Sequence, residues 1–235
     1  MKAMVLCAGY GTRLGDLTRE TPKPMLLIEG RPLLEYIIRH LGQQGFDEIA
    51  INLHFKPDIV QNYFGDGTKW GVHIVYSIEP ELLGTAGGVK KMAELLSQDD
   101  AFLVQYGDII TDQDFQTMLK IHQQKQALTT LLLHQRKKSN SIVTVNKDWR
   151  ITQFLERPKE EEQEGKLSHW VHSGIAICSP QLLEHIPKSQ FCDLPRDVYS
   201  KIVSSSQLFG YPLSGYRCAV DSPERLAEVR TAIHK

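Results

Sequence analysis

The sequence lacks the features that most directly mark membrane, secreted and metal-binding proteins. No apolar run reaches the 18 residues of a membrane span, and the opening MKAMVLCAG is broken by Gly9 too early for a secretory signal. Its four cysteines are widely separated and form no C-x-x-C pair, which argues against zinc and redox motifs. We therefore expect a cytoplasmic protein with free thiols and no membrane partner.

An excess of charge of one sign is also absent. Lys and Arg together number 27 and Asp and Glu 28, which gives a formal net charge of −1. Nucleic acids and anionic membranes attract strongly basic surfaces, so this balance gives no reason to expect either as a partner. Any electrostatic work must then be done locally by a few cations. The 235 residues, 41% of them hydrophobic, are enough for one domain with a substantial core.

What the chain does contain is a regular alternation of strand and helix patterns. AMVLCA, EIAINLH and AFLVQYGD are short apolar runs typical of buried strands, whereas RPLLEYIIRHLGQQG and QDFQTMLKIHQQ have helical spacing. Strands that alternate with helices predict right-handed βαβ crossovers. We therefore predict an α/β fold: a doubly wound, mostly parallel, Rossmann-like sheet flanked by helices, with ligands beyond the carboxyl ends of the strands.

The pattern changes after about residue 138. SIVTVNKDWRITQFLE predicts a hairpin, QLFGYPLSGYRCAV predicts a strand, a turn and a second strand, and SPERLAEVRTAI predicts a closing helix capped by Ser222. We expect a single domain over residues 1–235, with a first half at about 1–138 that contains the parallel sheet and a mixed half at about 139–235.

The most informative stretch is MVLCAGYGTRLGDLTRETPKPM, near the start of the chain. Its Gly9 and Gly11 follow a predicted strand, but the dinucleotide pattern G-x-G-x-x-G fails because Leu14 stands at its third glycine, and no P-loop motif is present. An ordinary turn explains one glycine, but not Arg13, nor Lys23 between two stiffening prolines. Glycines let amides approach phosphate oxygens, and Arg binds such oxygens bidentately. The segment therefore favours a polyphosphate ligand.

The same stretch resembles the signature of the sugar-1-phosphate nucleotidyltransferases (nucleotide-sugar pyrophosphorylases), approximately A-G-G-x-G-T-R-L followed further on by P-K-P. Tyr10 stands where that pattern has a glycine. ELLGTAGGV, VQYGDII, FLERPK, VHSGIAICSPQLLEHIP and CAVDSPERLAEV resemble further motifs of the family in the same order. Arg157 replaces a lysine of the family pattern, and His172 and Ser173 replace an Asn-Ala pair. The length matches the catalytic domain alone, without the hexapeptide-repeat β-helix of some members. The resemblance implies that residues at about 1–138 form a nucleotide-binding half and residues at about 139–235 a sugar-phosphate half.

The resemblance implies a Mg²⁺-dependent reaction in which a sugar-1-phosphate attacks the α-phosphorus of an NTP, giving an NDP-sugar and pyrophosphate. A phosphate monoester has a second pKa of about 6, so the nucleophile is largely deprotonated at neutral pH and needs no general base. The site must instead supply alignment and charge neutralisation. The implied partners are small-molecule substrates, and whether the chain forms a homo-oligomer stays open.

The resemblance also implies the site residues. Arg13 would hold the β- and γ-phosphates, and Lys23 would contact the α-phosphate or its bridge to the sugar phosphate. Asp108 and Asp221 would hold Mg²⁺, which prefers carboxylates together with phosphate oxygens and waters. The catalytic set is then Arg13, Lys23 and Asp108. The remaining nucleotide-binding residues would be Ala8, Gly9, Tyr10, Gly11, Thr12, Glu81, Gly84, Thr85 and Ala86. The sugar phosphate would be bound by Lys23, Gly107, Glu156, Arg157, Ser173 and Gly174.

Glu81 stands where the family reads the nucleobase. A carboxylate only accepts hydrogen bonds, and guanine offers N–H donors from N1 and N2. Since GTAG also resembles the guanylyltransferase subgroup, we expect GTP with mannose-1-phosphate or heptose-1-phosphate. The alternative is a uridylyl- or thymidylyltransferase acting on glucose-1-phosphate or another hexose-1-phosphate.

Two alternatives come from other classes. A nucleotide-sugar-binding regulatory relative should lose the phosphate-binding cations or the metal-binding aspartates, but Arg13, Lys23, Asp108 and Asp221 are all present. A nicotinamide oxidoreductase is disfavoured by the missing third glycine.

Overall fold

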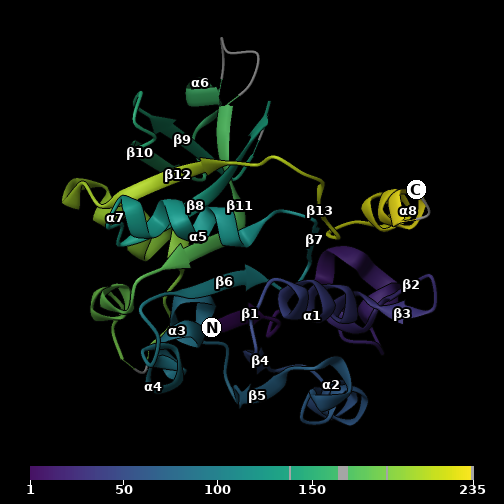
Figure 1. The fold of residues 1–235 in the computed structure, drawn as a ribbon. Coiled ribbons are helices and arrows are strands. Elements are labelled where there is room, and N and C mark those ends of the chain that lie inside the picture. Colours follow the sequence, from purple (N-terminus) through teal and green to yellow (C-terminus); the bar gives the residue numbers. More distant parts are fainter. Residues whose placement is uncertain (138, 164–168, 189, 234–235) are drawn as a thin grey trace. The chain divides into compact units, whose positions relative to one another are not determined.

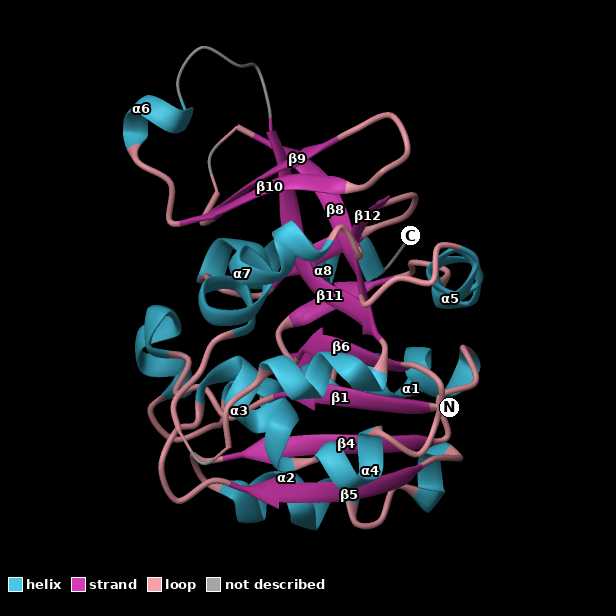
Figure 2. Cartoon of the chain, turned by 90° about the vertical axis from the view of Figure 1, so that its left-hand side faces the viewer, coloured by secondary structure: helices cyan, strands magenta, loops and turns pink. Residues whose placement is uncertain are grey.

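The strands that the sequence predicts near its start form a parallel sheet. In the computed structural model β1 (Lys2–Leu6), β4 (Glu48–Leu53) and β5 (His73–Ile78) are hydrogen-bonded in that order and run in the same direction. Figure 2 shows the three strands side by side. The apolar residues of β1 and β4 are buried almost without interruption, as expected for parallel strands covered on both faces, whereas β5, the last strand of the three, is partly exposed. The carboxyl ends of these strands therefore meet at one edge. The structure describes residues 1–137, 139–163, 169–188 and 190–233.

The chain forms two compact units that interleave along the sequence. Unit 1 contains Met1–Leu82, Gln105–Asp114 and Gly215–Lys235, and unit 2 contains Leu83–Val104 and Phe115–Ser214. In Figure 1 the yellow C-terminal helix lies beside purple segments from the start of the chain, and both belong to unit 1. The division expected near residue 138 separates two functional halves, and it stays a prediction. The two compact units divide the chain at other residues.

The helices of unit 1 begin and end where local signals predict. α1 (Leu33–Gln43) buries the apolar side of its helical pattern, and α2 (Pro57–Phe64) ends at Gly65, whose φ is 53°. α8 (Pro223–Ile233) begins after Ser222, whose Oγ accepts a hydrogen bond from the Arg225 amide at 3.3 Å. Arg230 of α8 donates to the Leu27 carbonyl at 3.0 Å, which fastens the helix beside the first residues of the short hairpin β2–β3. The hairpin and the shorter helices of unit 1 are β2 (Leu27–Ile28), β3 (Arg31–Pro32), and 3₁₀ helices over Thr12–Thr18, Lys23–Met25 and Thr68–Trp70.

A second pair of strands joins parts of unit 1 that are far apart in sequence. β7 (Ile109–Thr111) pairs antiparallel with β13 (Arg217–Ala219), and the Thr111 hydroxyl donates to the Tyr216 carbonyl, 105 positions away. The sequence QLFGYPLSGYRCAV does contain two strands, but they belong to different units. β12 (Leu208–Pro212) pairs in parallel with β8 of unit 2, whereas β13 returns to unit 1.

Unit 2 contains a mixed sheet in the order β10–β9–β11–β8–β12. β9 and β10 form the predicted hairpin around Asn146, and β11 runs antiparallel to β8. The predicted α/β class, with a mostly parallel sheet flanked by helices and a mixed second part, is confirmed. The strands of unit 2 are β8 (Thr129–Arg136), β9 (Ser141–Val145), β10 (Ile151–Glu156), β11 (His169–Cys178) and β12, and β6 (Phe102–Tyr106) carries the chain into unit 1. Its helices are α3 (Gly84–Lys91), α4 (Ala93–Leu96), α5 (Phe115–Gln124), α6 (Glu160–Gln163) and α7 (Ser200–Ile202), with 3₁₀ turns over Pro180–His185 and Val203–Ser205 and a π-helical turn over Leu194–Tyr199.

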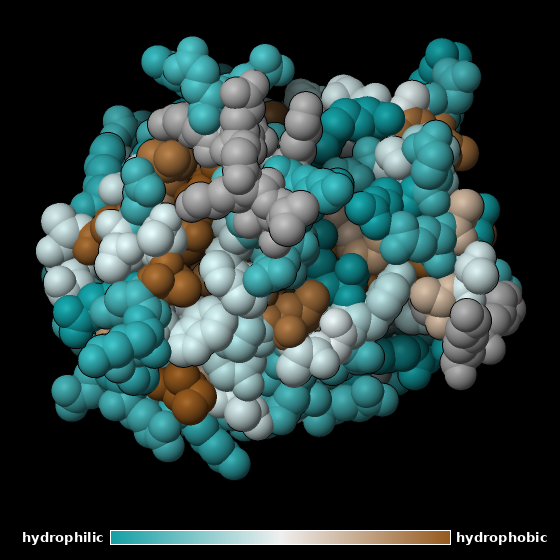
Figure 3. Space-filling view, turned by 90° about the horizontal axis from the view of Figure 1, so that it is seen from above, coloured by the Kyte–Doolittle hydropathy of each residue, from teal (hydrophilic) through white to brown (hydrophobic). Residues whose placement is uncertain are grey.

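The surface mixes polar and apolar side chains. On the face drawn in Figure 3, hydrophobic residues stand in small separate groups among hydrophilic ones. All four cysteines are buried and free, as the sequence predicts. Within the described ranges, no helix combines the length and the apolar character that crossing a membrane requires.

A buried histidine makes the stability of the fold depend on pH. His122 of α5 is 2% exposed; its Nδ1 lies 3.0 Å from the Thr130 hydroxyl and its Nε2 lies 3.1 Å from the Ser179 hydroxyl. Burial lowers the pKa of His122 from 6.5 to about 4. The unfolded chain then binds more protons than the folded chain between these two values, so stability is lost as the pH falls through this window. We expect the free energy of unfolding to drop by about 2 kcal/mol between pH 7.5 and pH 5 in denaturant titrations.

The matched variant is His122→Gln, which removes the titrating group. Its unfolding free energy should depend less on pH over the same window, even if its stability at pH 7.5 is lower. An equally steep pH dependence in this variant would assign the effect to other groups.

Candidate active site

The loop that follows β1 adopts the backbone conformation that its glycines permit. We call residues 7–13 the β1 loop. Gly11 has a φ of 69° and precedes the 3₁₀ helix over Thr12–Thr18. A Cβ on Gly11 would stand 3.0 Å from the Cβ of Lys23, so this glycine lets the loop lie against the P-K-P segment. At Gly9 no described atom apart from the glycine and its two chain neighbours lies within 4 Å of where a Cβ would stand, which leaves open space beside the loop.

Four charged residues predicted from the sequence meet in unit 1 as two ion pairs. Lys23 Nζ lies 2.5 Å from Asp108 Oδ2, with side chains only 12% and 21% exposed. Arg13 Nη1 lies 3.2 Å from Asp221 Oδ2, with side chains 68% and 32% exposed. One pair is therefore largely withdrawn from water, whereas the other is open to it.

The antiparallel pairing of β7 with β13 brings Asp108 and Asp221 to the same end of this two-stranded sheet. Asp108 directly precedes β7, and its carbonyl accepts a hydrogen bond from the Val220 amide at 2.8 Å. Asp221 is the next residue along the chain. The sequence predicts that both carboxylates follow apolar strands, and the antiparallel pairing explains how they become neighbours.

The carboxylates of Asp108 and Asp221 fit a magnesium ion whose other ligands are waters and phosphate oxygens. The described residues contain no cluster of three or more Asp, Glu, His or Cys side chains suited to a metal. Mg²⁺ in nucleotide sites commonly takes one or two carboxylates, with phosphate oxygens and waters completing the octahedron. Two carboxylates are enough for that arrangement, provided that their oxygens exchange the present bonds to Lys23 and Arg13 for the cation.

Gly107 allows the turn before β7 to approach the end of β1. Its amide donates to the Leu6 carbonyl at 2.9 Å, and a Cβ on it would stand 2.3 Å from the Cys7 sulfur. Burial raises the pKa of the Cys7 thiol, the Asp108 carboxylate raises it further, and Lys23 opposes both. Cys7 thus packs within the electrostatic reach of the buried ion pair. The sequence assigns Gly107 to the sugar phosphate; in unit 1 the close approach is to Leu6 and Cys7.

The GTAG segment begins α3 and is fastened within unit 2. A Cβ on Gly84 would stand 2.5 Å from the Cys192 carbonyl oxygen, and the Ala86 amide donates to the same oxygen at 2.8 Å. The Thr85 hydroxyl lies 3.2 Å from Asp193 Oδ1 and accepts from the Leu194 amide at 2.7 Å. These contacts explain the residue types of the motif, and contact with a nucleotide stays a prediction. Glu81, in unit 1, is exposed.

The predicted sugar-phosphate residues of unit 2 differ in exposure. Glu156 ends β10, and its pKa is raised by burial, which the neighbouring Arg157 partly opposes. Arg157 has a φ of 52°, and its amide donates to the Asn140 carbonyl at 2.7 Å. Ser173 is fully buried and its hydroxyl lies 2.9 Å from His134 Nδ1, so it contributes to packing in this structure. Gly174 has a φ of 77°, which favours glycine.

Sequence reasoning missed a charged cluster near Glu156. The charges of Asp193 and Arg196 act on the Glu156 carboxylate, and Arg196 also pairs with Asp197 at 2.8 Å. Arg196 and Asp197 lie on the π-helical turn over Leu194–Tyr199, and such turns are frequent at functional sites. The sequence DLPRDVY offered a signal, since it places three charges around a proline, but its spacing alone suggests only a short helix.

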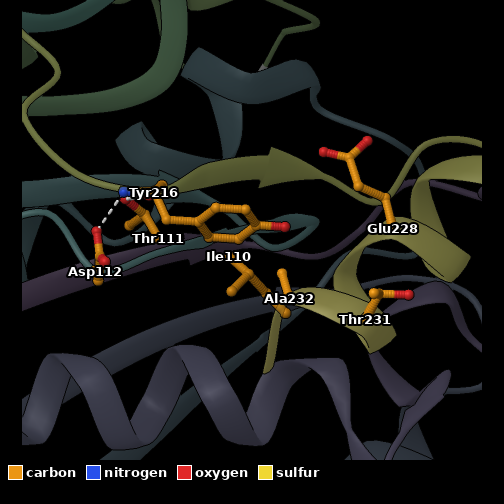
Figure 4. Close-up of a pocket in the computed structure, with 7 residues that line it drawn as sticks. All are labelled: Ile110, Thr111, Asp112, Tyr216, Glu228, Thr231 and Ala232. Atoms are coloured by element: carbon orange, nitrogen blue, oxygen red, sulfur yellow. Dashed lines mark hydrogen bonds between the residues drawn. The ribbon is translucent and has the colours of Figure 1, made fainter. Parts of the chain in front are cut away.

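A cavity of about 700 Å³ lies elsewhere in unit 1 (Figure 4). The Tyr216 ring extends over Ile110 toward α8, and the Tyr216 amide donates to Asp112 Oδ1 at 2.5 Å. Tyr216 and Asp112 are at the opposite end of the β7–β13 ladder from Asp108. None of the described residues that line the cavity is one that the sequence assigns to the site. The lining residues are Ile110, Thr111, Asp112, Tyr216, Glu228, Thr231 and Ala232.

Comparison with known proteins shows the family of the chain. A family model described as "Nucleotidyl transferase" matches residues 2–215. The chain belongs to the nucleotidyl transferase family. The resemblance found from the motifs is thus confirmed for the family, and the matched range includes Arg13, Lys23 and Asp108, while Asp221 lies beyond it.

Relatives of this nucleotidyl transferase carry different substrate names. It is 36% identical to a UTP–glucose-1-phosphate uridylyltransferase of Synechocystis over 89% of this chain and 57% of that protein. It is 28% identical to a mannose-1-phosphate guanyltransferase of Yarrowia lipolytica over 95% of this chain and 61% of that protein. The chain thus spans about three-fifths of the length of these relatives. A solved structure, a putative glucose-1-phosphate thymidylyltransferase from Bacillus anthracis, has the same fold with a TM-score of 0.87, 18% identity, and coverage of 99% and 94% of the two chains.

The close approach at Gly107 predicts a sharp difference between two glycines of this site. In Gly107→Ala the new methyl group would collide with the Cys7 sulfur and stand 2.9 Å from the Leu6 carbonyl oxygen. We expect a loss of about 1–3 kcal/mol in the free energy of unfolding, measured by denaturant titration. Gly9→Ala is the matched control, because its methyl group meets open space and its φ is not positive. Equal stabilities of the two variants would contradict the packing described for Gly107.

Proposed function

We propose that this protein transfers a nucleotidyl group from an NTP to a sugar-1-phosphate and releases pyrophosphate. The observation that carries the proposal is the meeting of Arg13, Lys23, Asp108 and Asp221 in two ion pairs. They lie in unit 1 with a glycine loop that follows the first strand of a parallel sheet. Membership of the family supports the same reaction.

The reaction requires that two strongly anionic reactants be held together. Two unit charges 4 Å apart repel by about 4 kcal/mol at an effective dielectric constant of 20, so bringing several phosphate charges together is a large part of the barrier. The sugar phosphate is itself a sufficient nucleophile near neutral pH, because its second pKa is about 6. The protein must therefore supply positive charge and in-line alignment rather than a base.

The two cations would take different parts of the reaction. Lys23 is shielded from water, so its charge acts strongly at short range; we assign it to the α-phosphate, where the new bond forms. Arg13 is exposed and presents a planar fork, which suits the β- and γ-phosphates that leave as pyrophosphate. Phosphate oxygens would replace the carboxylates as partners of these cations. Asp108 and Asp221 would then be free to hold Mg²⁺, which when bound supplies further neutralisation of the triphosphate.

For the substrates we propose GTP with mannose-1-phosphate or heptose-1-phosphate. The exposed acceptor Glu81 and the GTAG segment support this choice, as does the similarity to guanyltransferases. A specific observation favours the alternative of uridylyl or thymidylyl transfer to glucose-1-phosphate or another hexose-1-phosphate, namely the 36% identity to a uridylyltransferase. We expect the protein to act in the cytoplasm on these small molecules.

The experiment that tests the function is a matrix of NTPs against sugar-1-phosphates, with pyrophosphate release as the readout. We expect release with GTP and a manno-configured sugar phosphate, and its loss when Mg²⁺ is removed with a chelator. Higher rates with UTP or dTTP and glucose-1-phosphate would select the alternative. Binding of nucleotide-sugar without pyrophosphate release from any pair would reject the enzyme and favour a regulatory relative.

Asp108→Asn should separate catalysis from folding. The amide keeps the size of the side chain but loses the charge that pairs with Lys23 and that a metal would need. We expect kcat to fall by on the order of 100-fold or more, while the thermal unfolding curve still shows a cooperative transition. Asp16→Asn is the matched control, since Asp16 is 89% exposed and pairs only with Arg19 among the ion pairs of described residues. Near wild-type turnover by Asp108→Asn would remove Asp108 from the mechanism.

A further inference from the structure

Buried polar side chains connect the carboxyl ends of β1, β4 and β5. The Cys7 amide, at the start of the β1 loop, donates to Asn52 Oδ1 at 2.8 Å. Asn52 Nδ2 in turn donates to Glu79 Oε1 at 2.8 Å. Asn52 and Glu79 are 3% and 1% exposed, so these groups depend on one another for hydrogen bonding. The start of the loop is thereby tied to the residue that follows β5.

A second arm leads from Glu79 to the tip of the same loop. His54 Nδ1 lies 2.7 Å from the Glu79 carbonyl oxygen, and His54 Nε2 lies 2.6 Å from the Tyr10 hydroxyl. A carbonyl only accepts, so Nδ1 carries the proton, and Nε2 of the neutral ring accepts from Tyr10. The two rings also meet edge to face, with centroids 5.0 Å apart and an interplanar angle of 89°. The direction of the Tyr10 side chain is therefore set by His54.

Packing alone does not hold this part of the loop. Tyr10 is 48% exposed, and apart from Gly9 itself, Ala8 and Tyr10 no described atom lies within 4 Å of where a Cβ on Gly9 would stand. Glycine-rich backbone has many accessible conformations, and ordering it on ligand binding lowers affinity. The hydrogen bonds from Asn52 and His54 restrict the loop without filling the space beside it.

We propose that Asn52, Glu79 and His54 are positioning residues that hold the β1 loop in its triphosphate-binding conformation, through Cys7 at its start and Tyr10 at its tip. The proposal rests on the proposed function, since it assigns the loop to the triphosphate. It gives a role to Tyr10, which departs from the glycine of the motif: its hydroxyl provides a tether that a glycine could not. It also gives a role to His54, which belongs to none of the motifs found in the sequence.

A double-mutant cycle tests the Tyr10–His54 arm. Tyr10→Phe and His54→Phe each remove the hydrogen bond and keep an aromatic ring. We expect each to raise KM for the NTP about fivefold, as for one lost hydrogen bond, with kcat and KM for the sugar-1-phosphate within about twofold of wild type. The double variant should match the single ones, because both remove the same contact. His54→Gln, which keeps a donor and an acceptor, should recover part of the loss.

Tyr76→Phe is the matched control. Its hydroxyl donates to the Gly65 carbonyl at 2.8 Å, so the change removes a comparable hydrogen bond of unit 1 away from the β1 loop. We expect no change in KM for the NTP beyond about twofold. Additive effects of Tyr10→Phe and His54→Phe, or an equal effect of Tyr76→Phe, would overturn the proposal.

Amide hydrogen exchange of residues 8–13 provides a readout that does not depend on turnover. Exchange of these amides in the free protein should be about fivefold faster in Tyr10→Phe and in His54→Phe, and unchanged in Tyr76→Phe. Unchanged loop exchange in the first two variants would overturn the tether, whatever the protein's activity. If no NTP is turned over in the substrate matrix, the proposed function fails, and faster loop exchange would still support the tether itself.

Discussion

The ion pair of Lys23 with Asp108 is the contact on which the candidate site depends. Both side chains are mostly shielded from water, and Cys7 and Gly107 pack beside them. A charge in such surroundings is tolerated because its partner is present, and removing one partner leaves the other uncompensated. In the proposed function, Asp108 holds the Lys23 ammonium in place until a phosphate oxygen replaces the carboxylate.

This condition links charge to topology. The carboxylate belongs to the turn before β7, and β7 reaches its place by pairing with β13, from a distant part of the chain. The same pairing brings Asp221 beside Asp108 and across from Arg13. Residues 1–82 already contain the glycine loop and both cations. The set of charges is complete only when the last segment of unit 1, which begins at Gly215, adds Asp221.

The parts of this arrangement that could be predicted from the sequence are those encoded locally. β1, the turn at Gly11, the amphipathic α1 and the Ser222 cap of α8 follow from spacing and residue type within a few positions. The pairing of β7 with β13 has no such local signal. A glycine can indicate that two backbone segments pack closely, but it does not identify the second segment. In the structure Gly84 packs against Cys192, and Gly107 packs against Cys7. Asn52 was missed because one amide in an apolar strand does not reveal the carboxylate that it bonds.

The two kinds of constraint on the β1 loop act on different properties of the site. The ion pairs fix where positive charge is available, and the hydrogen bonds of Asn52 and His54 fix the backbone that lies between Cys7 and Tyr10. Both belong wholly to unit 1, whereas Glu156, Arg157 and the GTAG segment belong to unit 2. Under the proposed function, the part that binds phosphate would be separate from part of the machinery that selects the nucleotide and the sugar, and the relatives are named for different nucleotides and sugars. Under the proposed function, substitutions in the β1 loop and at the two ion pairs should act on every substrate pair alike, because all of them present the same triphosphate, whereas Glu81, also in unit 1, should affect the choice of base.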